Sequence, residues 1–471
     1  PTTIKSEVVF LLSHDNAMKD RHVRMMARFF LILPVLLESL QFIKKYKCMT
    51  CRAITARHLR YPLYLFRKKP ETMTEQEFDN RVKCLFDDHE KLISRPNIKK
   101  EGGNGIFDRY LHPIITRDHS PVFWRYDLDY RSNPHLMTRL GINTTFNAGA
   151  IKHAGKYCLA IRTEGFDVKS FFAIAESPNG IDNWRFRNRP IVMPVTSDPE
   201  MNVYDIRLTR HEDGWIYGLF CAERKDKSKP DDSSAALASC GIARTSDLDN
   251  WERLDDLKSG AAQQRNCVLH PEFVNGKYMI YTRPQSGFIE TGDSGISAGF
   301  CDSMEHAELG EEILVDPRQY HTVKEVKNGQ GPAPLKTEYG WIHLAHGVRR
   351  TAAGLRYTLY LFMTSPEEPW RVIKRPSGHF LEPLEDERVG DVSNVVFSNG
   401  WIADDDGTVF VYYASSDTRM HVATTTIDKL IDYVMNTPED AGRTQLCAAQ
   451  RDRMIENNLK IMAQKYPYIR F

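Results

Sequence analysis

Five segments of the sequence repeat one pattern, and this repeat restricts the possible folds more than any other feature. Each segment begins with a glycine turn, continues as a strand of aromatic and aliphatic residues, and finishes at a polar or charged side chain. The segments are Ala154–Arg162, Asp213–Arg224, Asn275–Arg283, Tyr339–His346 and Asp406–Asp417. Their glycines (Gly155, Gly214, Gly276, Gly340 and Gly407) lie roughly 59 to 67 residues apart. Such regular spacing indicates an array of similar structural units.

Units of about 60 residues with several short strands and no helix between them are typical of propeller blades. Five blades closed into a ring leave no long strand edge exposed. Two β-sandwiches in tandem are the alternative, but they would not repeat one signature five times. The sequence therefore predicts an all-β fold, a five-bladed β-propeller over residues 141–426. A lead-in over 73–140 and a helical segment over 427–471 complete the expected organisation.

Helices are expected on both sides of the propeller. Thr74 and Glu77 match a capping box, and apolar residues at helical spacing follow, which predicts a helix over 74–94. After the propeller, helices are expected at about 427–435 and 451–464.

Residues 1–72 differ in composition from the rest of the chain. Lys and Arg exceed Asp and Glu there by about nine, a charge asymmetry that marks a boundary. The apolar run Phe29–Leu37 is far shorter than the ~20 residues needed to span a bilayer, and no signal-peptide cleavage site follows it. We therefore expect a basic extension outside the functional core, and a functional chain that begins at Met73.

The charge balance and the cysteines exclude several classes of function. With 63 Lys and Arg against 62 Asp and Glu, the chain has no electrostatic basis for binding nucleic acid or an anionic membrane. Its nine cysteines are scattered apart from Cys48 and Cys51, which fits a reducing compartment. No second cysteine pair follows at similar spacing, so no metal site is expected.

The polar ends of the repeated strands are candidates for a binding site. If equivalent strands surround the propeller axis, these ends meet at one central pocket. They are Arg162, Glu223 with Arg224, Arg283, His346 and Asp417. Each alone is explained by a solvated strand end, but five polar ends at equivalent places favour a site.

The stretch Asn202–Arg224 contains the candidate for catalysis. Asp213 and Gly214 lie between two apolar-alternating runs, which predicts a tight hairpin. Asp205 follows Tyr204 near the start of the first strand, where turn residues are the usual choice. A turn-capping role is the alternative for this carboxylate.

Many ordered motifs resemble glycoside hydrolase family 130, from about Met73 to the C-terminus. The motifs are Asn147–Ile151, Ala175–Ile181, Asn202–Asp205, His211–Trp215, Arg265–Phe273, Tyr281–Gln285, Leu344–Arg349, Gly390–Asn394 and Tyr412–Arg419. The chain is most similar to those bacterial, cytoplasmic members that phosphorolyse a β-mannosyl-glucose disaccharide. The resemblance implies a five-bladed propeller, as the repeat does independently. Residues 1–72 have no counterpart.

The resemblance implies reversible, inverting phosphorolysis of the disaccharide to α-D-mannose 1-phosphate and glucose, with phosphate as co-substrate and no cofactor. A phosphorylase of β-1,4-mannooligosaccharides, a β-mannoside hydrolase and a non-catalytic sugar-binding propeller are the alternatives. Because phosphate itself is the nucleophile, one protein carboxylic acid is enough, whereas an inverting hydrolase needs a second carboxylate to activate water. Assembly into a homo-oligomer through the terminal helices is also expected.

The resemblance also implies roles for individual residues. Asp205 is the expected general acid, which transfers its proton through a substrate hydroxyl. The expected phosphate site comprises Arg265, Arg283 and Lys336, with His346 and Tyr357 close by, since Arg and Lys suit a phosphate dianion. Expected sugar contacts are Asn147, Arg162, Asp167, Tyr204 and Asp417, with Asp391 and Asn394 as candidates that turn capping also explains. Departures from the family at Val168 and over 291–299 affect the expected acceptor specificity.

Overall fold

The computed structural model describes residues 73–285 and 295–469 of the chain. The chain divides into two units, Pro1–Met73 and Thr74–Phe471, and the strands of the described residues all belong to the second unit. The predictions made for residues 1–72, for Cys48 and Cys51, and for the first part of the 291–299 segment lie outside the described residues.

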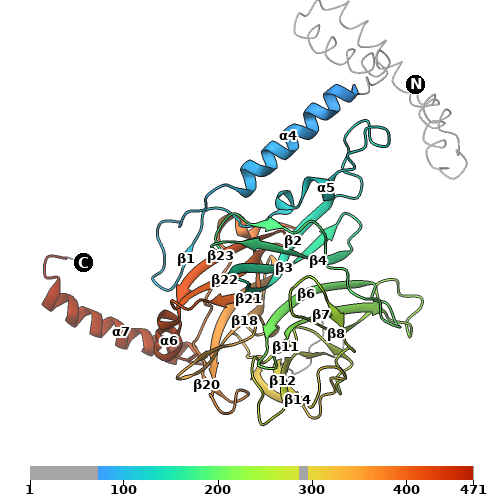
Figure 1. Cartoon of the computed structure of the whole chain (residues 1–471). Helices are drawn as coiled ribbons and strands as arrows, with labels where there is room; N and C mark the ends of the chain where they lie inside the picture. Colours follow the sequence, from blue (N-terminus) through green and yellow to red (C-terminus); the bar gives the residue numbers. More distant parts are fainter. Residues whose placement is uncertain (1–72, 286–294, 470–471) are drawn as a thin grey trace, which may run out of the picture. The chain divides into compact units, whose positions relative to one another are not determined.

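Within the described residues, five sheets of four or five strands follow one another along the chain (Figure 1). The first comprises β2 (Ile142–His153), β3 (Lys156–Gly165), β4 (Ser170–Ser177) and β5 (Arg185–Phe186). The second comprises β6 (Asn202–Arg210), β7 (Ile216–Lys225), β8 (Ala236–Thr245) and β9 (Glu252–Arg253). The third comprises β11 (Val268–Leu269), β12 (Tyr278–Thr282), β14 (Gly295–Cys301) and β15 (Ile313–Pro317), and β10 (Gln263–Gln264) pairs separately with β13 (Pro284–Gln285).

The fourth and fifth sheets each depart from the simple four-stranded order. The fourth comprises β16 (Lys327–Gln330), β18 (Gly340–Thr351), β19 (Gly354–Thr364) and β20 (Val372–Lys374), and β17 (Leu335–Thr337) also pairs with β18. The fifth comprises β21 (Val396–Ala403), β22 (Thr408–Ser415), β23 (Arg419–Thr426) and β1 (Asp108–Arg109).

The five sheets close into a ring, which confirms the predicted five-bladed β-propeller. The first strand of blade 1, β2, contacts β6 of blade 2 on one side and β21 of blade 5 on the other. Figure 1 shows the strands of blade 1 beside those of the last blade. The short strand β1 precedes the propeller in the chain and pairs with β23, with Asp108 opposite Thr424. A strand from the beginning of the unit thus completes its last blade.

The hydrophobic core is divided among the contacts between neighbouring blades. One cluster, for example, joins Ile161 and Leu159 of blade 1 to Tyr412 and Val422 of blade 5. Another joins Phe172 of blade 1 to Phe220 of blade 2. Corresponding clusters lie between blades 2 and 3, 3 and 4, and 4 and 5. Burial of apolar area between blades therefore stabilises the ring all the way around its axis.

The repeated glycines lie in hairpin turns that need positive φ. Gly155, Gly214, Gly276, Gly340 and Gly407 have φ of 75°, 95°, 76°, 145° and 84°, a region that glycine adopts without steric cost. In four blades the turn joins the first strand to the second, and in blade 4 it joins β17 to β18. The repeated apolar segments are therefore the second strands of their blades, except that in blade 4 the segment is β18.

The helices flank the propeller along the chain as predicted. The helix α4 (Glu75–Ile93) begins at a capping box of Thr74 and Glu77. After blade 5 come α6 (Ile427–Asn436) and α7 (Thr444–Lys465), and α7 begins earlier than expected. Short helices are α5 (Val122–Arg125), η1 (Arg117–His119) and η2 (Glu385–Arg388). None of the helices in the described residues has the length and apolar character to cross a membrane.

Candidate active site

A cavity of about 880 Å³ lies where the five blades meet, and every blade contributes polar side chains to it. Blade 1 contributes Asn147 and Arg162, blade 2 Tyr204, Asp205 and Glu223, the third-blade region Arg265 and Arg283, blade 4 Lys327, His346 and Tyr357, and blade 5 Asp417. The polar strand ends that the repeat predicted thus meet at one cavity, with a representative from each blade. Polar groups converging on a concave site are typical of a ligand pocket.

Asp205 is turned into the cavity by an irregularity of β6. The β6–β7 register shifts between Tyr204 and Arg207, and Asp205 has a φ of 60°. A non-glycine residue in this region is uncommon, and such residues concentrate at functional sites. The carboxylate accepts hydrogen bonds from Asn147 Nδ2 at 2.9 Å and Arg162 Nη1 at 3.3 Å. Bulges are a known device for re-aiming a side chain next to a site.

Arg207 holds this irregularity in place through its guanidinium group. It is fully buried, and its Nη1 donates to the backbone carbonyl of Asp205 at 2.8 Å. Its Nε donates to the carbonyl of Gly331 at 2.9 Å, and Nη2 to that of Gln330 at 3.3 Å. One guanidinium therefore ties the strand that bears Asp205 to the blade on another side of the axis.

Basic groups crowd another part of the cavity. Burial lowers the pKa of Lys327 to about 8, and the charges of Arg283 and Arg265 add to this effect. Burial also lowers the pKa of Arg283 to about 10, with Arg265 as the next cause. The pKa of His346 is lowered well below its usual range, chiefly by burial and then by Arg283. Cations that disfavour one another's charge in this way are stabilised by an anion bound between them.

Tyr357 and His346 contribute two aromatic rings to this cluster of basic residues. Their rings are stacked with centroids 6.2 Å apart, and the ammonium of Lys327 lies 5.3 Å from the Tyr357 ring centroid. Burial raises the pKa of Tyr357 to about 12, so its hydroxyl stays neutral and is able to donate to an anion.

Asp417 follows β22 and faces the same cavity as Asp205. Burial raises its pKa to about 7, the negative charge of Asp205 adds to the increase, and Arg162 opposes it. Arg162 also pairs with Glu164 at 3.0 Å. A buried carboxyl with a raised pKa next to a second carboxylate is a common arrangement in sites that handle protons.

Four of the predicted site residues do not line the cavity. Lys336 forms an ion pair with Glu272 at 2.7 Å. It lies opposite Trp341, five residues from His346 along β18, or about 17 Å at the usual rise of a strand. Its predicted contact with phosphate is therefore not supported by its position.

The other three predicted residues lie outside the lining for separate reasons. Asp167 is exposed in the turn between β3 and β4, beside the exposed Val168. Asp391 is exposed and accepts a hydrogen bond from Asn143 at 3.2 Å, and its charge contributes to the raised pKa of Asp417. Asn394 has a φ of 66°, and its carbonyl accepts from the Tyr357 backbone N–H.

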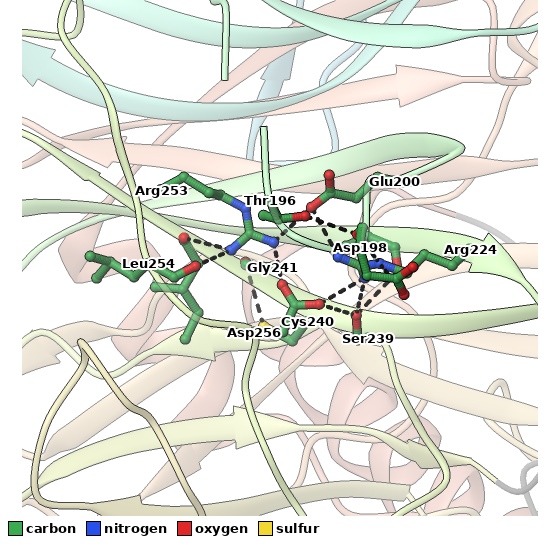
Figure 2. A network of polar contacts seen from close by, with 12 residues as sticks. Thr196, Asp198, Glu200, Arg224, Ser239, Cys240, Gly241, Arg253, Leu254 and Asp256 are labelled. Carbon is green, nitrogen blue, oxygen red and sulfur yellow. Dashed lines mark hydrogen bonds and ion pairs between the residues drawn. The ribbon is translucent and has the colours of Figure 1, made fainter. Parts of the chain in front are cut away.

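Arg224 also lies outside the cavity, in a separate polar network (Figure 2). It donates to Asp256 at 2.8 Å, to Ser239 at 3.0 Å and to Glu200 at 3.2 Å. Arg253 donates to the same Glu200 at 2.8 Å. This network ties the segment that precedes β6 to β7, β8 and β9, so Glu223 and its neighbour Arg224 have different surroundings.

Sequence reasoning missed Lys327 and Arg207. Lys327 is the first residue of β16, a strand that lacks the glycine turn of the repeat. Because β16 pairs with β18, Lys327 lies opposite Val348, two residues beyond His346. A search for basic residues in the strand before the repeated one would have found it. From the sequence alone, Arg207 cannot be distinguished from a charged residue on the solvent-facing side of a strand.

The comparisons with known proteins agree with this fold. A model of glycoside hydrolase family 130, described as beta-1,4-mannooligosaccharide phosphorylase, matches residues 117–436. The chain belongs to this family. It is 59% identical to a 4-O-beta-D-mannosyl-D-glucose phosphorylase of Bacteroides fragilis, over 82% of this chain and 99% of the relative.

Two further proteins are similar to the chain at lower sequence identity. A beta-1,4-mannooligosaccharide phosphorylase of Ruminococcus albus is 34% identical over 67% of this chain and 92% of its own length. The solved structure of a beta-1,2-mannobiose phosphorylase from Listeria innocua aligns with a TM-score of 0.56 over 72% of this chain and 99% of that chain. At 19% identity, this likeness concerns the fold.

Proposed function

We propose that the protein is an inverting phosphorylase that converts 4-O-β-D-mannosyl-D-glucose and phosphate to α-D-mannose 1-phosphate and D-glucose, reversibly. The observation that carries the proposal is the basic group of Arg265, Arg283 and Lys327, which shares one cavity with Asp205. The high identity to the Bacteroides fragilis enzyme supports the choice of substrate.

The proposed reaction needs one proton and one anionic nucleophile. A phosphate oxygen forms a bond to C1 of the mannosyl group while the bond from C1 to O4 of glucose breaks. The leaving O4 takes up a proton, which Asp205 supplies through a mannosyl hydroxyl. General-acid assistance of this kind contributes about 10²- to 10⁴-fold to a rate.

The basic residues take the place of the second carboxylate that an inverting hydrolase would use. Arg offers a planar fork to phosphate oxygens and Lys a point charge. These groups are already in place around the cavity, so they stabilise the charge of the nucleophile without rearranging at the moment of reaction. The reaction requires no cofactor besides phosphate as co-substrate.

The proposed test measures mannose 1-phosphate formed from mannosylglucose with and without phosphate. Phosphate-dependent formation of the sugar phosphate is expected. Release of mannose at the same rate without phosphate would identify a hydrolase, and absence of turnover with retained sugar binding would identify a binding protein.

A phosphorylase of β-1,4-mannooligosaccharides is the second candidate, because the matching family model carries that description. The two differ in the acceptor, so the reverse reaction distinguishes them. With α-D-mannose 1-phosphate as donor, glucose should be a much better acceptor than mannose or mannobiose. A preference for mannobiose would favour the second candidate.

We also propose that the enzyme acts in the cytoplasm. The seven cysteines of the described residues are all free thiols, which is typical of a reducing compartment. The proposed product is a charged sugar phosphate, which a cell retains and uses directly. Fractionation of the native cells with an antibody against the chain tests the location.

A homo-oligomer is proposed from the surface of α7. This helix exposes Leu446, Met454, Ile455 and Leu459, each close to half or more of its full area. Apolar side chains grouped on a helix are common at subunit interfaces. Light scattering from the purified chain gives the number of subunits directly.

A further inference from the structure

Glu223 is an acidic residue at the basic end of the cavity, and the proposed chemistry gives it no role. It occupies the end of β7, lines the cavity, and is about a quarter exposed. Its Oε2 accepts a hydrogen bond from the Tyr204 hydroxyl at 2.8 Å. A carboxylate beside a phosphate site is unfavourable for an incoming dianion by Coulomb's law, so its position calls for a reason.

Tyr204 connects Glu223 to one of the proposed phosphate ligands. Arg265 Nη1 donates to the Tyr204 hydroxyl, and the same hydroxyl donates to Glu223. Burial raises the pKa of Tyr204 far above its usual range, so the hydroxyl is neutral and able to serve both neighbours. The order Arg265, Tyr204, Glu223 is thus a continuous chain of hydrogen bonds.

Arg265 is also close to the carboxylate directly. Its Nη2 lies 3.7 Å from Glu223 Oε2, within ion-pair range but longer than a hydrogen bond. By contrast, Arg283 and Lys327 form no ion pair with a carboxylate in the described part of the chain. Glu223 therefore lies where a second anion would compete with phosphate for one ligand and leave the other two unaffected.

We propose that Glu223 sets the affinity for phosphate by competing with it for the guanidinium of Arg265. This inference rests on the proposed phosphate site. A reversible phosphorylase must release α-mannose 1-phosphate as well as bind phosphate, and three cations with the buried Arg207 nearby would retain either anion strongly. A carboxylate that pairs with Arg265 as the anion dissociates makes the exchange of phosphate and α-mannose 1-phosphate easier.

The competing explanation is that Glu223 only orients Arg265 through Tyr204. The two explanations predict opposite results for Glu223→Gln. The amide oxygen still accepts from the Tyr204 hydroxyl, so the geometry is kept while the negative charge is lost. Competition predicts tighter binding of phosphate, whereas a purely orienting role predicts unchanged or weaker binding.

The experiment measures the KM for inorganic phosphate at saturating mannosylglucose, and the KM for α-mannose 1-phosphate in the reverse direction. In Glu223→Gln both should fall about twofold to fivefold, the upper part of the range expected for a partly exposed charge pair, while the KM for mannosylglucose stays the same. A phosphate KM that is unchanged or raised overturns the proposal. If the wild type shows no phosphate-dependent turnover, the proposed function itself has failed.

Two further variants locate the effect. Glu272→Gln is the matched control, because Glu272 pairs with Lys336 away from the cavity, and its phosphate KM should equal that of the wild type. In an Arg265→Lys background, Glu223→Gln should lower the phosphate KM much less, because the shared ligand has changed. An undiminished effect there would mean that Glu223 repels phosphate directly, and would overturn competition for Arg265.

Discussion

At the scale of single residues, the site depends on how the surroundings hold one carboxylate. Asp205 accepts hydrogen bonds from Asn147 and Arg162 through its side chain while its backbone stays at positive φ. Both features place the carboxyl group at the wall of the cavity before any substrate binds. Asp417 faces the same space with a pKa raised to about 7 by burial, so one of these two carboxyls readily carries a proton near neutral pH.

Replacement of Asp205 by asparagine separates catalysis from folding. Asn tolerates positive φ well, so Asp205→Asn should unfold at nearly the wild-type temperature. Because the proposed acid is gone, kcat for phosphorolysis should fall by about 10²- to 10⁴-fold. The exposed Asp167→Asn serves as control and should keep kcat within about twofold. An Asp205→Asn variant with wild-type kcat would move the acid to another residue, with Asp417 the next to test.

Lys327 and Lys336 form a matched pair for testing the phosphate site. Loss of a charged hydrogen-bond donor to phosphate costs about 1.5–3 kcal/mol, so Lys327→Met should raise the phosphate KM about 10- to 100-fold. Lys336→Met should leave it unchanged, because Lys336 pairs with Glu272 outside the cavity. A phosphate KM that rises in Lys336→Met and not in Lys327→Met would support Lys336 as the phosphate ligand, as the family resemblance implied.

The same lysine predicts a dependence on pH. Because the pKa of Lys327 is lowered to about 8, its ammonium is charged below that value and loses its proton as the pH rises through it. The phosphate KM of the wild type should therefore increase above about pH 8. In Lys327→Met this increase should disappear, which steady-state kinetics between about pH 6 and 9 will show.

These residues also show what the sequence could and could not predict about the site. The polar strand ends were found because a repeat places equivalent residues at equivalent positions, whatever the surrounding side chains are. Lys336 was expected from the family resemblance, but a resemblance between motifs does not reveal which of two neighbouring strands runs toward the axis. The pairing of β16 with β18 decides that, and pairing between strands depends on the whole blade.

At the scale of elements, irregularities in the first strands of three blades help to determine which side chains face the cavity. The register shifts in β2 between Phe146 and Gly149, in β6 between Tyr204 and Arg207, and in β21 between Phe397 and Gly400. In β2 and β6 the shift contains a residue that lines the cavity, Asn147 or Asp205. Sequence alternation does not reveal a bulge, because one extra residue changes which face each later side chain occupies.

Arg207 offers a test of how β6 is held in place. Arg207→Met keeps most of the volume but leaves the carbonyls of Asp205, Gln330 and Gly331 without this donor. Burying unsatisfied carbonyls costs about 1–3 kcal/mol, so urea denaturation should show a loss of that size. Because Asp205 is then less well positioned, kcat should fall more than the KM for either substrate rises. Full stability together with full activity would contradict this role.

At the scale of the whole molecule, the ring is closed by a strand that sequence reasoning did not identify. The strand β1 comprises Asp108 and Arg109, too short to show any periodicity, and its partner β23 lies more than 300 residues later in the chain. The blade number followed from the repeat, whereas closure depends on a contact between distant parts of the chain. Arg109 strengthens this closure through an ion pair with Glu387.

The closing strand allows a sharp test of which part of the chain is needed. A variant that begins at Met73 retains α4, β1 and all residues of the cavity, and 82% of the chain already matches 99% of the Bacteroides fragilis relative. It should therefore keep wild-type kcat, phosphate KM and thermal midpoint.

A control variant that begins at Leu111 lacks β1 and Phe107, so it exposes the edge of β23 and part of the core. This variant should unfold at a lower temperature or aggregate. If the variant that begins at Met73 loses activity while circular dichroism shows an intact fold, residues before Met73 contribute to the site. If the variants that begin at Met73 and Leu111 are equally stable, β1 does not stabilise the closed ring.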